Sequence, residues 1–64
     1  MSNLVKQQRE LLKMSQEELA SKSNISRVYL SKIERGKSMP SYAIASQISA
    51  ALGKKVNEIF LTNL

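Results

Sequence analysis

Apolar side chains recur at intervals of three and four residues along most of the chain, the spacing that places them on one face of an α-helix. The clearest example contains Ile44, Ile48 and Leu52. These residues lie between Ser41, a residue type that caps helices, and Gly53, a residue type that ends them. No segment alternates apolar and polar residues for long enough to predict a strand. The hydrophobic pattern therefore predicts an all-α protein.

Two helices are predicted at the ends of the chain. The first would run from a cap at Ser2 or Asn3 to about Lys13. Its apolar stripe would consist of Leu4, Val5, Leu11 and Leu12. The last, a short helix, would run from Val56 to about Leu61. With two more helices in the middle, the sequence predicts one compact five-helix domain over residues 1–64.

The two middle helices are separated by their capping residues. Ser15 begins the first of them, and Glu18 stands where its side chain can bond back to the Ser15 amide as a capping box. This helix is expected to end near Lys22. Ser26 is expected to cap the next helix, and Gly36 to end it in the left-handed conformation.

Residues 16–35, which contain these two helices, have the pattern of a helix-turn-helix. Ala20 lets the two helices approach closely, and Asn24 tolerates the left-handed conformation that a sharp turn requires. The inward positions are filled by Leu19, Ile25, Leu30 and Ile33. The usual ligand of this motif is DNA.

The helix expected to begin at residue 27 would turn one face outward. Successive residues at roughly 100° intervals place most of its candidate base-contacting side chains away from the core and leave Arg27 at the side of the first turn, from which its long side chain can swing toward a ligand. These candidates are Arg27, Val28, Ser31 and Lys32. Exposed cations often only keep a surface soluble, but an outward Val28 suits contact with a thymine methyl group. Tyr29 flanks the inward stripe, and its hydroxyl group could reach a phosphate.

Charge supports a polyanionic partner. Ten Lys and Arg residues against five Glu residues give a formal net charge of +5. Such an excess of positive charge favours phosphate backbones or anionic membrane surfaces as binding partners. Four cations, Arg27, Lys32, Arg35 and Lys37, lie within eleven residues that contain one acid, Glu34.

Composition argues against most other functions. The chain has no Cys, His or Asp, so it offers no thiolate or imidazole metal site and no recognisable acid–base or nucleophile arrangement. We therefore expect no enzymatic activity, cofactor, metal ion or small-molecule ligand. No apolar run is long enough to cross a membrane. Charged residues interrupt the N-terminal segment, so we expect no signal peptide and a cytoplasmic location.

The segments MSQEELASKSNISRVYLSKIERGKSMPS and ISAALGKKVNEIF together resemble the phage-repressor-like helix-turn-helix family that includes lambda repressor and Cro. The resemblance covers nearly the whole chain. It implies a five-helix domain that binds a two-fold related operator as a dimer and regulates transcription. It leaves open whether the chain is a phage repressor, a restriction-modification controller or a regulator of a neighbouring operon.

The resemblance also assigns roles to single residues. It places Arg27, Val28 and Lys32 at base-reading positions. It places Gln16 at a position that contacts a phosphate or a base edge, and it assigns contacts with the DNA backbone to Arg35, Lys37, Ser38, Ser41 and the amide of Tyr42. It implies a structural ion pair between Arg9 and Glu34.

Three residues depart from the family pattern. Asn24 and Lys13 replace glycines that are common in the family, and Ser23 stands where an apolar residue is preferred. These replacements suggest modest stability.

Assembly is expected to depend on the C-terminal segment, which is rich in large apolar residues. Val56 and Phe60 are expected to turn inward, which leaves Ile59, Leu61 and Leu64 as the predicted homodimer contact. The alternative is that all five close the core.

An antitoxin-like protein that binds another protein through this C-terminal segment is a second functional hypothesis. A basic surface for membranes or RNA is a third. The basic face has no stacking platform of exposed Phe or Tyr, which argues against RNA, and Leu30 and Ile33 are needed for the core rather than for lipid.

Overall fold

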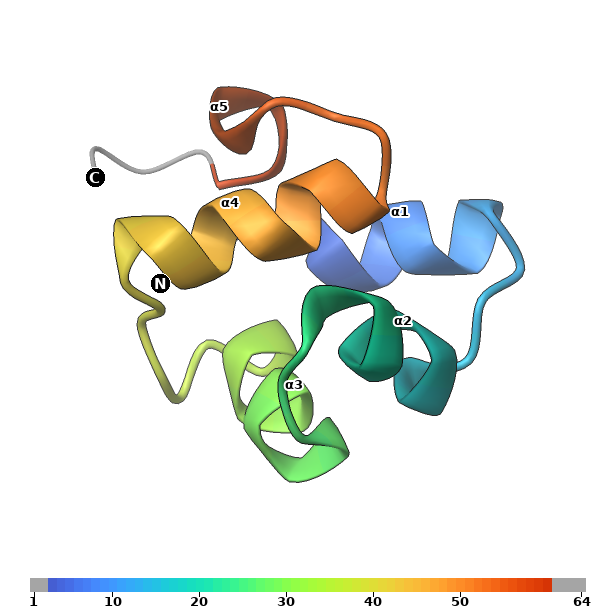
Figure 1. Ribbon diagram of the computed structural model, residues 1–64, viewed down its shortest axis with the longest axis horizontal. Helices are drawn as coiled ribbons and strands as arrows, with labels where there is room; N and C mark the ends of the chain where they lie inside the picture. The colour runs from blue at the N-terminus through green and yellow to red at the C-terminus, as the bar shows by residue number, and fades with distance from the viewer. Residues whose placement is uncertain (1–2, 61–64) are drawn as a thin grey trace.

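The computed structural model describes residues 3–60, and this part of the chain forms five α-helices. The helices are α1 (Val5–Leu11), α2 (Gln16–Ser23), α3 (Arg27–Glu34), α4 (Tyr42–Ala51) and α5 (Val56–Ile59). α4 crosses the middle of the molecule, with α5 on one side of it and α2 and α3 on the other (Figure 1). The predicted all-α, five-helix fold is confirmed. None of these described helices has the length and apolar character that a membrane span requires.

Three serine caps begin α2, α3 and α4 at the predicted residues. The side-chain oxygens of Ser15, Ser26 and Ser41 each accept a hydrogen bond from the backbone N–H three residues later, at 3.0, 3.0 and 3.2 Å. Gly36 (φ 74°) follows α3 and Gly53 (φ 71°) follows α4 in the left-handed conformation that glycine adopts without steric cost. Local capping chemistry therefore sets these boundaries as predicted.

α1 is shorter than predicted and buries a different face. It begins at Val5, whose N–H donates to the Asn3 side chain at 3.0 Å, and it ends at Leu11. Its buried residues are Val5 and Arg9, one turn apart. The predicted apolar stripe is therefore wrong at its C-terminal end, where Leu11 and Leu12 are 69% and 50% exposed. Leu11 lies on the side of the helix opposite Arg9, and Leu12 follows the last helical residue.

α5 is a single turn that ties the C-terminal part of the described chain to its beginning. The Lys55 backbone N–H donates to the Glu58 carboxylate at 2.8 Å, which compensates for a residue type that caps poorly. The Leu4 N–H donates to the Ile59 carbonyl at 2.8 Å, and Asn3 and Phe60 form an isolated antiparallel bridge. These contacts join residues more than fifty positions apart.

The expected role of Ile59 in a dimer contact requires correction. Its side chain is 0% exposed and belongs to the core, as does that of Phe60. A side chain buried within its own chain is not available to a second chain in this conformation. The other two residues of that expected contact, Leu61 and Leu64, lie outside the described residues.

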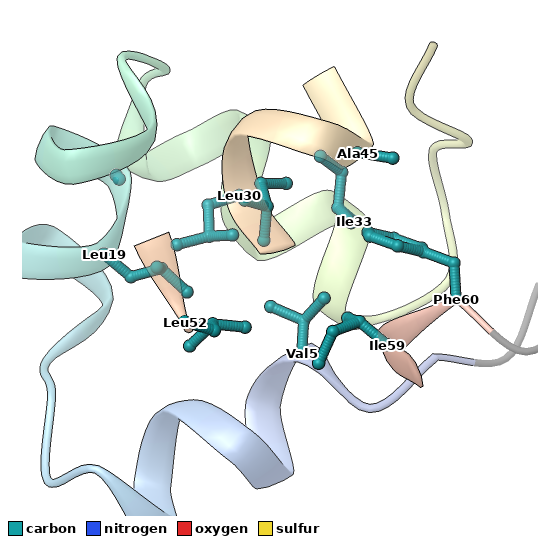
Figure 2. Packing of buried hydrophobic residues seen from close by; sticks show 10 residues of the cluster. Val5, Leu19, Leu30, Ile33, Ala45, Leu52, Ile59 and Phe60 are labelled. Atoms are coloured by element: carbon teal, nitrogen blue, oxygen red, sulfur yellow. The ribbon is translucent and has the colours of Figure 1, made fainter. Parts of the chain in front are cut away.

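The core lies where all five helices meet, and Figure 2 shows its side chains converging from α1, α2, α3, α4 and the region of α5. Its buried apolar residues are Val5, Leu19, Ala20, Leu30, Ile33, Ala45, Ile48, Leu52, Ile59 and Phe60. Ser23 in α2 and Ser49 in α4 are also buried. Neither hydroxyl group has a hydrogen-bond partner among the described residues, which is a cost to stability.

Candidate nucleic-acid interface

α3 has two faces of opposite character. Leu30 and Ile33 are fully buried and point into the core cluster (Figure 2). Arg27, Val28 and Lys32 are exposed. Val28 is 57% exposed; a single exposed apolar residue is ordinary on a protein surface, but this one lies between two cations on the outward face, where it could contact an apolar group of a ligand. The outward face therefore offers two cations flanking an apolar contact.

The turn between α2 and α3 has the geometry expected from the sequence. Asn24 adopts the left-handed conformation (φ 60°, ψ 40°), as predicted. The Ile25 N–H donates to the Ala20 carbonyl at 3.0 Å, which closes the turn onto α2. Ala20 is buried, and its small side chain lets the two helices approach closely. α2 and the turn thus hold α3 with its outward face free.

The remaining positions expected to contact the DNA backbone continue beyond α3. Arg35 and Lys37 are exposed, and Ser38 is half-exposed. The Arg35 Nε donates to the Ser31 carbonyl at 3.3 Å, which directs the guanidinium along the C-terminal turn of α3. Tyr42, at the start of α4, is 69% exposed. Tyr29 is half-buried and packs against the core, so any phosphate contact would come from its hydroxyl end.

Behind this face lies an ion pair between α1 and α3. The Arg9 Nε donates to the Glu34 Oε2 at 2.8 Å, and the Arg9 Nη2 donates to the Oε1 at 3.2 Å. The two side chains are only 10% and 2% exposed. The Arg9 Nη1 also donates to the Met14 carbonyl at 2.9 Å. Arg9 and Glu34 thus form the pair that the family resemblance implied.

The Glu34 carboxylate affects both the pKa of its partner and the charge of the outward face. Hydrogen bonding to Glu34 raises the pKa of the Arg9 guanidinium, and burial opposes that shift. Glu34 is the only acid between residues 27 and 37, and its carboxylate is buried in the ion pair with Arg9. The cations that surround it in the sequence, Arg27, Lys32, Arg35 and Lys37, are all exposed. The exposed charge of this segment is therefore purely positive.

Gln16 joins the buried pair to the outward face, a connection that the sequence reasoning missed. Its Nε2 donates to the Glu34 Oε1 at 3.0 Å, and its Oε1 accepts a longer contact of 3.5 Å from the Arg27 Nη1. The sequence indicated Gln16, Arg27 and Glu34 separately. It could not show them in contact, because only the crossing of α2 and α3 brings position 16 between positions 27 and 34.

Sequence comparisons place this geometry among known proteins. A family model described as Helix-turn-helix matches residues 5–59. A helix-turn-helix-type transcriptional regulator of Methanocaldococcus jannaschii is 39% identical over 61 residues, which cover 95% of this chain and 92% of that protein. Another, from Methanothermobacter thermautotrophicus, is 34% identical over 62 residues, covering 95% and 90% of the two chains.

Solved structures have the same fold. The restriction-modification controller protein C.AhdI from Aeromonas hydrophila superposes with a TM-score of 0.82 at 30% identity, over 84% of this chain and 82% of that one. A chain of the SinR–SinI protein complex gives a TM-score of 0.78 at 37% identity, over 83% of this chain and 52% of that one. The similarity thus extends through sequence and three-dimensional structure.

Proposed function

Because the chain belongs to the phage-repressor-like helix-turn-helix family of DNA-binding transcriptional regulators, which are not enzymes, we propose that it is a homodimeric repressor of a two-fold related operator. α3 would enter the major groove, which is about 12 Å wide and admits one helix. The observation that carries the proposal is the outward face of α3. It exposes Arg27, Val28 and Lys32 on a helix whose other face closes the core.

Four side chains of that face would read the base sequence of the DNA. The Arg27 guanidinium and the Lys32 ammonium group suit the O6 and N7 acceptors of guanine. Val28 suits a thymine methyl group, and the Ser31 hydroxyl can donate or accept. Arg27 and Val28 occupy the first turn of α3, the end of a recognition helix that meets base edges.

Residues around this face would position the helix on the DNA backbone. Cations neutralise phosphates and release counterions, while hydroxyl, amide and backbone N–H groups fix the register. The proposed backbone contacts are Gln16, Tyr29, Arg35, Lys37, Ser38, Ser41 and Tyr42. They come from the start of α2, from α3 and its following loop, and from the start of α4.

A dimer would match the two-fold symmetry of an operator. Two copies of α3 would have to lie about 34 Å apart to read successive major grooves on one side of the duplex. With Ile59 in the core, Leu61 and Leu64 are the remaining candidate contacts from the C-terminal segment. A domain of this size buries a small core, so a partner subunit would add to its stability.

Selection of bound sequences from random duplex DNA tests the proposal. We expect a motif with two related half-sites whose centres are about ten base pairs, or a multiple of one helical turn, apart. Enrichment of a single half-site without a repeat would support base reading by α3 but contradict binding as a homodimer. Failure to enrich any sequence would overturn sequence-specific recognition.

A further inference from the structure

Four side chains form a hydrogen-bonded series that runs from the buried ion pair to the outward face of α3. Arg9 from α1 binds Glu34, Glu34 binds Gln16 from α2, and Gln16 faces Arg27 at the start of α3. The Glu34 side chain is 2% exposed and cannot itself reach DNA in this conformation. The series therefore connects an inaccessible carboxylate to a proposed base-reading guanidinium.

The chemistry of the groups at both ends sets the direction of the Gln16 amide. An ionised carboxylate only accepts hydrogen bonds, so the amide nitrogen must face Glu34. A guanidinium only donates, so the amide oxygen must face Arg27. The contacts have these polarities, with Nε2 to Glu34 at 3.0 Å and Oε1 to Arg27 at 3.5 Å. Reversal of the amide would place donor against donor at the Arg27 end.

We infer that Glu34 is a positioning residue for sequence readout: it orients Gln16, and Gln16 biases the Arg27 guanidinium toward one direction before DNA is bound. This inference rests on the proposed function. The contact of 3.5 Å is the loosest of the series, so it restricts Arg27 without holding it rigidly. Arg27 keeps its other N–H groups for the acceptors of a guanine edge. A side chain already oriented loses less conformational freedom on binding.

Glu34→Gln tests the inference with a side chain of nearly the same shape. Arg9 needs an acceptor and would take the single remaining carbonyl oxygen. The new amide nitrogen would then face Gln16, whose own amide would reverse and turn its N–H groups toward Arg27. Arg27→Ala first identifies the base pair that Arg27 reads. At that base pair we expect Glu34→Gln to lower discrimination about fivefold, the effect of one ordinary hydrogen bond. Discrimination at the base pair that depends on Lys32 should stay unchanged.

The ratio between matched and mismatched duplexes separates positioning from a structural role. A variant that is only less stable has fewer active molecules, which lowers affinity for every duplex and leaves the ratio unchanged. Glu17→Gln is the matched control, because it removes the same charge from the exposed first turn of α2. An equal loss on all duplexes, or the same loss in Glu17→Gln, would overturn the inference.

Gln16→Leu is a second test of the inference, for the case that Glu34→Gln does not fold. This variant keeps the Arg9–Glu34 pair and should therefore keep the fold. It should lower affinity for all duplexes through the lost backbone contact, and it should also lose discrimination at the Arg27 base pair. Unchanged discrimination there would overturn the inference. A parent chain without any sequence preference is a different failure, because it would overturn the proposed function itself.

Discussion

The molecule uses arginine in two contrasting environments, one inside and one on its surface. Arg9 is nearly buried and satisfied by Glu34 and the Met14 carbonyl, so its charge joins α1 to α3. Arg27 is exposed and has one long contact, to Gln16. The comparison teaches that residue type does not assign function here. A cation whose three guanidinium nitrogens each donate inside the molecule stabilises the fold, whereas a cation with few internal contacts remains available to a phosphate or a base.

Removal of one partner of the buried pair should produce the largest effect. Arg9→Ala leaves the Glu34 carboxylate buried beside an empty space, and we expect a loss of about 3–5 kcal/mol in the free energy of unfolding, measured in urea. Glu34→Ala should cost a similar amount. The double variant Arg9→Ala/Glu34→Ala should lose much less than the sum of the two single variants, because no charge is left buried alone. A double variant as unstable as the sum of the single variants would show that the pair is not coupled.

Lys32→Ala should leave stability unchanged and reduce discrimination between operator and altered operator. Lys32 is exposed on the second turn of α3, and a good side-chain contact with a base is worth about 1–3 kcal/mol. Titration of duplexes that differ at single base pairs measures this effect. An equal loss of affinity for operator and random duplex would make Lys32 a backbone contact instead.

Ser49→Ala sharpens the comparison on the buried side, because its hydroxyl group has no partner among the described residues, unlike Arg9. We expect an increase of about 1 kcal/mol in the free energy of unfolding, since the cost of burying an unpaired hydroxyl is removed. Ser46→Ala, on the same helix but half-exposed, is the control for helix propensity. Equal gains in the two variants would assign the effect to propensity and show that the Ser49 hydroxyl is satisfied.

Lys37→Ala should have the smallest effect, and one that is uniform across sequences. Lys37 is exposed in the loop after α3, where a contact with a phosphate releases counterions. We expect the slope of log affinity against log salt to become shallower by about one unit, with discrimination unchanged. A slope equal to that of the parent chain would place Lys37 away from the DNA.

The sequence predicted the segment from α2 to α4 well because its boundaries are local. Ser15, Ser26 and Ser41 cap helices within three residues of themselves, and Asn24 supplies the left-handed turn. At Ser15 the hydroxyl accepts from the Glu18 N–H, but the hydrogen bond from the Ser15 N–H to the Glu18 carboxylate, which a full capping box requires, is not present among the described residues.

The chain ends were predicted less well because distant contacts decide them. The Leu4 N–H binds the Ile59 carbonyl, and this pairing draws Ile59 into the core and away from the expected dimer contact. No local pattern could show that pairing. The same burial weakens the antitoxin-like alternative, which required an apolar C-terminal surface that Ile59 and Phe60 do not supply.

The site shows the same division between local and distant information. The outward residues of α3 follow from helical periodicity: Arg27, Val28 and Lys32 are exposed as expected, and Ser31 is half-exposed. The link from Glu34 through Gln16 depends on how two helices cross, so the sequence indicated its members but not their contact.

The most direct test of the proposed interface is a nuclear magnetic resonance titration of the ¹⁵N-labelled chain with a duplex carrying the selected operator. We expect the largest changes in chemical shift on residues 27–32 and on the Gln16 side chain, with smaller changes after α3. Such changes should be weak on α5, which lies across α4 from α3 (Figure 1). Largest changes on α1 and α5, with α3 unaffected, would contradict the central claim that the outward face of α3 reads DNA.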